Sequence, residues 1–132
     1  MAILKKRKRK KPIILIAEDD KYIAHAFRDG FLRKGFEVIN AYNGKEALEI
    51  IKKKIPGIIL LDLVMPVKNG LEVLEEIKKD EKVKEIPVIV FSNLEEEESI
   101  KKAKELGAVE YLLKANFSME EVIAKIKKYL EK

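Results

Sequence analysis

The sequence predicts an α/β domain in which five parallel strands alternate with helices. Apolar runs of three to five residues recur along the chain, separated by segments with helical periodicity, as is typical of buried parallel strands. Four of these runs end directly on a charged or polar residue. The length of 132 residues suits one domain with a substantial core. The four runs are Ile13–Ala17 before Glu18, Ile58–Leu61 before Asp62, Val88–Phe91 before Ser92, and Tyr111–Leu113 before Lys114.

The composition excludes several classes of function. The chain is 47% hydrophobic and 39% charged and has no cysteine, which rules out disulfides, zinc–thiolate sites and thiol catalysis. Its one histidine, His25, excludes a site built on a histidine cluster, and we expect it on the surface. No apolar stretch approaches the roughly 18 residues that span a bilayer. We therefore expect a cytoplasmic protein.

The positive charge is concentrated at the amino terminus. Residues 1–12 hold seven of the 28 basic residues and no acid, so the rest carries 21 basic against 23 acidic residues, a net charge of −2. Runs of like charge repel and stay unfolded, so we expect residues 1–11 to form a flexible basic arm and residues 12–132 to form the domain. The arm is either a solvated tail or a binding segment for polyanions such as nucleic acid or anionic lipid. It contains no aromatic residue for stacking on bases.

The strand order follows from where the charges lie. The second and fifth predicted strands, residues 36–40 and 109–113, contain internal charges, whereas the other three are apolar throughout. Apolar strands belong in the centre of a parallel sheet and mixed strands at its edges. Together with right-handed crossovers, this predicts a doubly wound, flavodoxin-like (βα)5 sheet of order 2-1-3-4-5.

The predicted helices have recognisable ends. Glycines are expected to end the first and fourth helices, and Ser118 with Glu121 forms a capping box at the start of the fifth. Asn93 is expected to cap the fourth helix, with Glu95–Glu98 in its first turn. The sequence assigns no role to Asp20 or Gly30. The predicted helices cover residues 20–34, 44–53, from 70 onward, from 94 to Gly107, and from 119 onward.

The strand ends predict a site for a metal ion and a phosphoryl group. In an open parallel sheet the carboxyl ends of all strands lie on one edge, so the acids 18–20 and Asp62 should meet Ser92 and Lys114 there. Clustered carboxylates repel unless a cation lies between them, and magnesium needs only one or two of them. Asp62 could then attack phosphorus as a nucleophile, while Lys114 binds the anion and Ser92 donates a hydrogen bond.

The same residues resemble a known family. The acid pair Glu18-Asp19, the segment from Asp62 to Gly70 with the pattern D-x-x-M-P-x-x-x-G, Ser92 and Lys114 occur in order, each at a strand end. This combination is similar to the CheY-like receiver domains of two-component response regulators. The resemblance covers about residues 12–131, which is everything except the arm.

The resemblance implies a magnesium site and a phosphoacceptor. Asp62 corresponds to the aspartate that accepts the phosphoryl group. Asp19 corresponds to the direct magnesium ligand, Glu18 to its partner acting through water, and the backbone carbonyl of Val64 to a further ligand. The implied protein is a phosphoacceptor signalling domain that assists its own magnesium-dependent phosphorylation and dephosphorylation, and not an enzyme.

The resemblance also implies a conformational switch. Ser92 and Lys114 correspond to the residues that bind the phosphoryl oxygens, and Tyr111 to the aromatic residue that turns inward when the hydroxyl moves. Receivers usually have proline after the lysine, in a peptide that is often cis, but here Ala115 follows. A cis bond before a residue other than proline costs about 2.5–4 kcal/mol, so the conformation of this peptide stays open.

The leading hypothesis is a stand-alone receiver. It would be phosphorylated by a histidine kinase or phosphotransfer protein and would then bind a protein effector through its fourth helix, fifth strand and fifth helix, a face that could also form a homodimer. A phosphatase of the haloacid dehalogenase type is disfavoured because Val64 stands where a second acid is needed. The remaining alternative is an engineered or repurposed receiver that acts as a scaffold or binds polyanions through its arm.

Overall fold

The five strands form one parallel sheet in the predicted order. The computed structural model describes residues 12–131, and the predicted arm of residues 1–11 lies outside them. The sheet order is β2-β1-β3-β4-β5, and every neighbouring pair is parallel. The strands are β1 (Ile13–Ala17), β2 (Glu37–Ala41), β3 (Ile58–Leu61), β4 (Val88–Ser92) and β5 (Glu110–Leu113).

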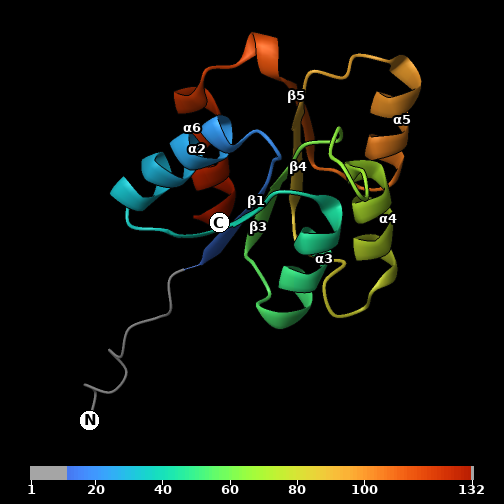
Figure 1. Ribbon diagram of the computed structural model, residues 1–132, viewed down its shortest axis with the longest axis horizontal. Helices are drawn as coiled ribbons and strands as arrows, with labels where there is room; N and C mark the ends of the chain where they lie inside the picture. The colour runs from blue at the N-terminus through green and yellow to red at the C-terminus, as the bar shows by residue number, and fades with distance from the viewer. Residues whose placement is uncertain (1–11, 132) are drawn as a thin grey trace.

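Helices cover both faces of the sheet. Helices α2 and α6 lie on one face, and α3, α4 and α5 lie on the other (Figure 1). None of the helices described between residues 12 and 131 is long and apolar enough to cross a membrane. The bounds are α2 (Lys21–Arg33), α3 (Gly44–Lys53), α4 (Gly70–Lys79), α5 (Glu97–Glu105) and α6 (Met119–Leu130), with a short 3-10 turn, η1 (Lys114–Asn116), between β5 and α6.

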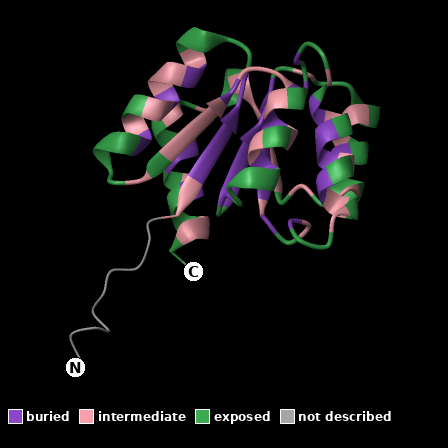
Figure 2. Ribbon diagram, turned by 60° about the horizontal axis from the view of Figure 1, so that its bottom comes forward, coloured by how far each residue is buried: buried purple, intermediate pink, exposed green. Residues whose placement is uncertain are grey.

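The sheet separates two hydrophobic cores. Because side chains alternate along each strand, successive residues of β1, β3 and β4 point to opposite faces. Figure 2 shows the central strands buried along almost their whole length. One core contains Ile14, Ile16, Ile58, Leu60, Ile89 and Phe91 with Phe27, Phe31, Val122 and Ile126 from α2 and α6. The other contains Leu15, Ala17, Ile59, Leu61, Val88 and Val90 with residues of α3, α4 and α5.

The edge strands are less buried than the central ones, as predicted from their internal charges. Only Ala41 of β2 and Leu112 of β5 are fully buried, whereas β3 and β4 are buried throughout. A charged residue at an edge can reach water without breaking the core. The sheet order is therefore encoded in the strands themselves.

The predicted cap at Asn93 is wrong, and the structure gives the reason. Helix α5 begins at Glu97, and its cap residue Glu96 makes no side-chain capping bond. The amide of Leu94 instead donates to the Ser92 hydroxyl at 3.3 Å, and the Leu94 carbonyl accepts from Tyr111 at 2.6 Å. These two bonds hold the segment after β4 in a loop, so the helix starts later. The predicted capping box at Ser118 is present.

Gly30, which the sequence left unexplained, is a packing residue. It faces α6, and a Cβ atom at this position would lie 2.7 Å from Cδ1 of Ile123. The glycine lets α2 and α6 approach closely across the same face of the sheet. The helix propensity lost at Gly30 is the cost of that contact.

One residue in the loop after β3 has an unfavourable backbone. Val67 has a φ of 71°, and it is the only residue other than glycine with positive φ among residues 12–131. The amide of Lys68 donates to the Pro66 carbonyl at 2.7 Å, which closes a three-residue γ-turn around Val67. A γ-turn with positive φ is rare and strained, and positive φ makes a β-branched residue an outlier.

We expect Val67→Asn to stabilise the protein. The Val67 side chain is 75% exposed, so little burial is lost, and asparagine tolerates positive φ. The free energy of unfolding in urea should rise by about 1 kcal/mol. Val109→Asn is the control, since Val109 is also exposed but has negative φ, and it should give no gain. An equal or lower stability for Val67→Asn would contradict the strain argument.

Candidate functional site

The residues predicted to bind the metal ion and the phosphoryl group line one pocket at the carboxyl edge of the sheet, whereas the predicted switch residue Tyr111 lies outside it. Its volume is about 340 Å3, and the loops after β1, β3, β4 and β5 form its walls. The pocket lies where ligands bind in open α/β sheets, outside the carboxyl ends of the strands. Its lining residues are Glu18, Asp19, Asp20, Asp62, Val64, Ser92, Asn93 and Lys114.

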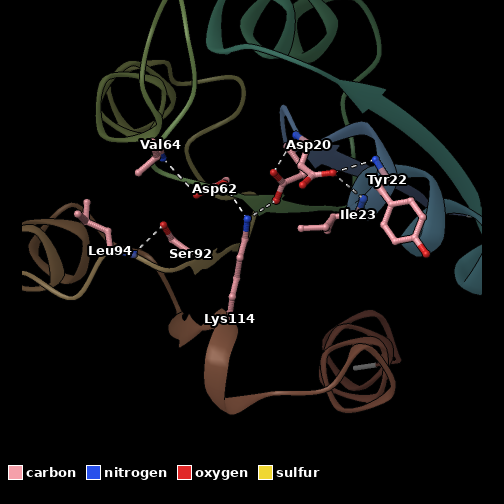
Figure 3. Close-up of polar contacts among 9 residues, drawn as sticks. Asp20, Tyr22, Ile23, Asp62, Val64, Ser92, Leu94 and Lys114 are labelled. Atoms are coloured by element: carbon pink, nitrogen blue, oxygen red, sulfur yellow. Dashed lines mark hydrogen bonds and ion pairs between the residues drawn. The ribbon is translucent and has the colours of Figure 1, made fainter.

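Two of the carboxylates are buried and share one lysine. Glu18 is 4% exposed and Asp62 is 6% exposed, although neither lies in the hydrophobic core. The Lys114 ammonium lies 2.7 Å from Oε1 of Glu18. It also lies 2.9 Å from Oδ2 of Asp62 (Figure 3). An unpaired buried carboxylate would be costly, so Lys114 holds both charges in place.

The pKa shifts reflect this crowding. Burial raises the pKa of Glu18, and the neighbouring Asp62 adds to the effect, while Lys114 and the Asp20 amide only partly oppose it. Burial alone would lower the pKa of Lys114, but its hydrogen bonds to Glu18 and Asp62 outweigh burial and raise it. Lys114 is therefore a firmly charged ammonium ion between two acids.

The pocket has the donor set of a hard-cation site. Oxygen atoms of Glu18, Asp19 and Asp62 all lie within 4.8 Å of one another. Three carboxylates face a single ammonium ion, which leaves an excess of negative charge at the sheet edge. Asp19 is exposed, so a cation could bind there from solvent and keep several of its waters, as magnesium prefers.

Asp20, to which the sequence assigned no role, caps a helix. Its side chain accepts hydrogen bonds from the amides of Tyr22 at 2.9 Å and Ile23 at 3.2 Å and so caps α2 (Figure 3). An aspartate one residue before a helical segment is itself a capping signal. The capping role was not predicted because Asp20 directly follows Glu18 and Asp19, two acids expected at the metal site. Its capping role accounts for an acid at position 20, and Asp20 therefore does not have to be a metal ligand.

Close backbone contacts fix the loop that carries Asp62. Gly70 begins α4, and its amide donates to the Leu63 carbonyl at 2.9 Å. A Cβ atom at Gly70 would collide with the Asp62 carbonyl, and one at Gly44 would collide with the Lys68 carbonyl. Gly44 and Gly70, the first residues of α3 and α4, thus pack directly against the backbone of the loop between residues 62 and 70 and restrict its movement. The Val64 amide donates to Oδ1 of Asp62 at 3.2 Å, which orients the carboxylate.

Ser92 and Tyr111 are connected through one residue. The Ser92 side chain is fully buried at the end of β4 and accepts a hydrogen bond from the Leu94 amide. The hydroxyl of Tyr111 on β5 donates to the carbonyl of the same leucine. Burial raises the pKa of Tyr111, and the negative charge of Asp62 raises it further. Tyr111 does not line the pocket, so its connection to the site runs through Leu94.

The peptide after Lys114 is trans. The sequence left the conformation of the Lys114–Ala115 bond open, and there is no cis peptide among residues 12–131. The chain turns directly into η1 at Lys114. The lysine nevertheless reaches Glu18 and Asp62, so the trans bond is compatible with the site.

Comparisons with known proteins establish the family. A model of the response regulator receiver domain matches residues 14–127, and the chain belongs to this family. The chain is 38% identical over 76 residues to the polar-differentiation response regulator DivK of Brucella anthropi, a match that covers 58% of this chain and 62% of that protein. The match thus spans less than two thirds of this relative.

Solved structures share the fold. The receiver domain of the Francisella response regulator 1452 superposes with a TM-score of 0.82 and 31% identity, covering 92% of this chain and 98% of that chain. The Mn2+-bound form of response regulator Rcp1 superposes with a TM-score of 0.82 and 28% identity, covering 92% and 96%. The predicted α/β fold and strand order are confirmed.

We expect Lys114→Met to destabilise the protein strongly. Methionine fills similar space but leaves Glu18 and Asp62 buried without a cation. The free energy of unfolding at neutral pH without divalent ions should fall by about 2–3 kcal/mol. Lys101→Met, at an exposed position on α5, is the control and should change it by less than about 0.5 kcal/mol. A loss no larger than that of the control would show that Lys114 does not hold the acids.

Proposed function

We propose that this receiver accepts a phosphoryl group on Asp62 and switches its binding surface for a partner protein. The observation that carries the proposal is the position of Asp62, whose carboxylate lies in a polar pocket between Lys114 and the acids at the end of β1. The donor would be a phosphohistidine of a histidine kinase or a phosphotransfer protein. We place the protein in the cytoplasm, where such donors act.

The transfer would be a displacement at phosphorus. An oxygen of Asp62 bonds to phosphorus, the bond from phosphorus to the donor's imidazole nitrogen breaks, and the electron pair stays on the imidazole. Lys114, already within 2.9 Å of the Asp62 carboxylate, would pair with an oxygen of the transferred group. The Ser92 hydroxyl would donate a hydrogen bond to a second oxygen of the phosphoryl group. The Val64 amide, which donates to Oδ1 of Asp62, would keep the carboxylate oriented for the attack.

The metal in this proposal is magnesium. Asp19, Asp62 and the carbonyl of Val64 would hold it directly, and Glu18 through water. The ion would neutralise charge on the transferring group. The excess of carboxylates over ammonium in the pocket supports a divalent cation, as does the Mn2+-bound form of the related regulator Rcp1.

The switch would start at Ser92. A hydrogen bond from Ser92 to the phosphoryl group would pull the serine away from the Leu94 amide, and Leu94 also anchors the Tyr111 hydroxyl. Freed from that anchor, Tyr111 could turn inward and reshape the surface formed by α5, β5 and α6. A protein effector, or a second copy of the chain, would read that surface.

The direct test is phosphorylation by a small donor. Wild-type protein with acetyl phosphate and magnesium should gain the mass of one phosphoryl group, measured by intact mass spectrometry. Asp62→Asn should gain none, because the amide is not a nucleophile toward phosphorus. Asp19→Asn should respond only weakly, because it removes the direct metal ligand.

Asp20→Asn is the matched control for the phosphorylation test. The same substitution next to Asp19 alters a helix cap rather than a metal ligand, and asparagine caps helices as well as aspartate does. This variant should be labelled as the wild type is. Undiminished labelling of Asp62→Asn would overturn the proposed acceptor, and equal loss in both Asp19→Asn and Asp20→Asn would overturn the metal assignment.

We also expect the phosphorylated form to be long-lived. Hydrolysis needs a water in line with the bond from Asp62 to phosphorus, and the residues two positions after Asp62 and Ser92 are Val64 and Leu94. Val64 is 59% exposed at the mouth of the pocket, and neither side chain can orient a water. Each missing orienting contact should slow hydrolysis about tenfold, equivalent to about 1.4 kcal/mol.

The measurement is the decay of phosphorylated protein after donor removal. The variant with Val64→Asn and Leu94→Glu should lose its phosphoryl group faster than the wild type, with unchanged magnesium affinity. Val67→Asn is the control, because it adds the same side chain to the same loop outside the residues that line the pocket. Decay of the double variant at the wild-type rate or more slowly would show that these positions do not control the water.

A further inference from the structure

A second pocket, which is apolar, lies next to Lys114. Its volume is about 180 Å3, and it opens between α2 and the first residue of α6. The side chain of Lys114 lines both this pocket and the acidic one, and every other lining residue of this pocket is apolar. One lysine thus borders a polar pocket and an apolar pocket. The lining residues are Ile23, Phe27, Phe91, Lys114 and Met119.

The apolar pocket has a buried floor and an accessible rim. Phe27 and Phe91 are buried, and their rings meet edge to face with centroids 5.5 Å apart. Ile23 and Met119 are half-buried, so a solute can reach them. Figure 3 shows Ile23 beside the side chain of Lys114, whose ammonium lies 5.9 Å from the centroid of the Phe91 ring. The charge in this pocket therefore comes from the lysine that is expected to bind the phosphoryl group.

The size and the lining of the pocket suit a small apolar group. A dry cavity of about 150 Å3 lined by leucine, isoleucine and phenylalanine can hold a benzene molecule. A pocket of about 180 Å3 therefore has room for a chain of about three or four carbon atoms. Such a chain gains free energy when it leaves water, whereas a strongly polar group would lose hydration against the four apolar side chains.

We propose that this pocket binds the acyl chain of a small phosphodonor, so that the protein prefers acyl phosphates with a longer apolar chain to acetyl phosphate. The inference rests on the proposed phosphorylation of Asp62. With the phosphoryl group at the Lys114 ammonium, the acyl chain would lie along the lysine side chain against Ile23 and Met119. An Asp62 oxygen bonds to phosphorus, the bond from phosphorus to the acyl oxygen breaks, and its electron pair leaves on the carboxylate.

The intrinsic reactivity of the donor would not produce this preference. Butyryl phosphate and acetyl phosphate release carboxylates of nearly equal basicity, so their bonds to phosphorus are about equally reactive. The two donors differ by two methylene groups. Burying both methylenes in the transition state should raise the rate constant for transfer about tenfold.

The test compares the two donors at the same magnesium concentration. The second-order rate constant for phosphoryl uptake, followed by intact mass spectrometry, should be about tenfold higher for butyryl phosphate than for acetyl phosphate. Ile23→Ser should lower this ratio toward one, because serine removes apolar surface from the pocket. Ile50→Ser is the matched control and should keep the wild-type ratio, since Ile50 is a half-buried isoleucine on α3, at the other face of the sheet.

The ratio of the two rate constants is insensitive to partial unfolding, because unfolding lowers both rates alike. Met119→Gln is a second variant, which keeps the length and the helix propensity of the side chain but places an amide at the rim. It should also lower the ratio. A binding measurement adds a readout without phosphoryl transfer. 2-Oxopentylphosphonate, in which a methylene replaces the bridging oxygen of butyryl phosphate, should bind severalfold more tightly than 2-oxopropylphosphonate and should shift the NMR signal of the Met119 methyl group.

The outcomes separate this inference from the proposed function. Equal uptake from the two donors by the wild type would overturn the donor preference and leave Asp62 as the acceptor. A preference that persists in both Ile23→Ser and Met119→Gln, or that is lost equally in Ile50→Ser, would overturn its assignment to this pocket. Uptake from neither donor would instead overturn the proposed phosphorylation itself.

Discussion

The contact of Lys114 with Glu18 and Asp62 is the constraint on which the rest of the molecule depends. Two carboxylates that are nearly inaccessible to water would repel each other and lose hydration, so they persist only because one ammonium lies within 3 Å of both. The three residues come from the ends of β1, β3 and β5, which are far apart in sequence. Their convergence requires the strand order and the parallel register of the whole sheet. The packing of the apolar strands thus determines where the charged groups of Glu18, Asp62 and Lys114 lie.

Much of this arrangement could be predicted because the signals are local. Unbroken apolar runs marked β1, β3 and β4 as central strands, and the charges in β2 and β5 marked them as edges, which was enough to order the sheet. The site followed from the same pattern, because parallel strands bring their carboxyl ends together. The residues expected there do line one pocket. Their individual roles in phosphoryl transfer remain a proposal based on that geometry and on membership of the receiver family.

The features that could not be predicted depend on contacts between distant segments. Asn93 is a good cap by type, but Ser92 and Tyr111 hold the following residue in a loop, and the tyrosine is 17 residues away from its partner. Gly30 is costly in a helix until Ile123 is placed against it, and Gly44 is an ordinary helix start until the Lys68 carbonyl is placed beside it. A sequence pattern records what a segment prefers, and it does not record which atoms of another segment will lie against it.

The topology also separates two kinds of chemistry within one small domain. Each helix runs back against the strands, so acids that suit helix starts gather at the carboxyl edge and bases that suit helix ends gather at the amino edge. A strand of five residues such as β1 spans roughly 16 Å, so the two edges are separated by far more than the reach of an ion pair. The acidic pocket therefore forms at the edge where the helix starts favour acids, and the bases at the helix ends lie at the other edge, where they cannot pair with its carboxylates.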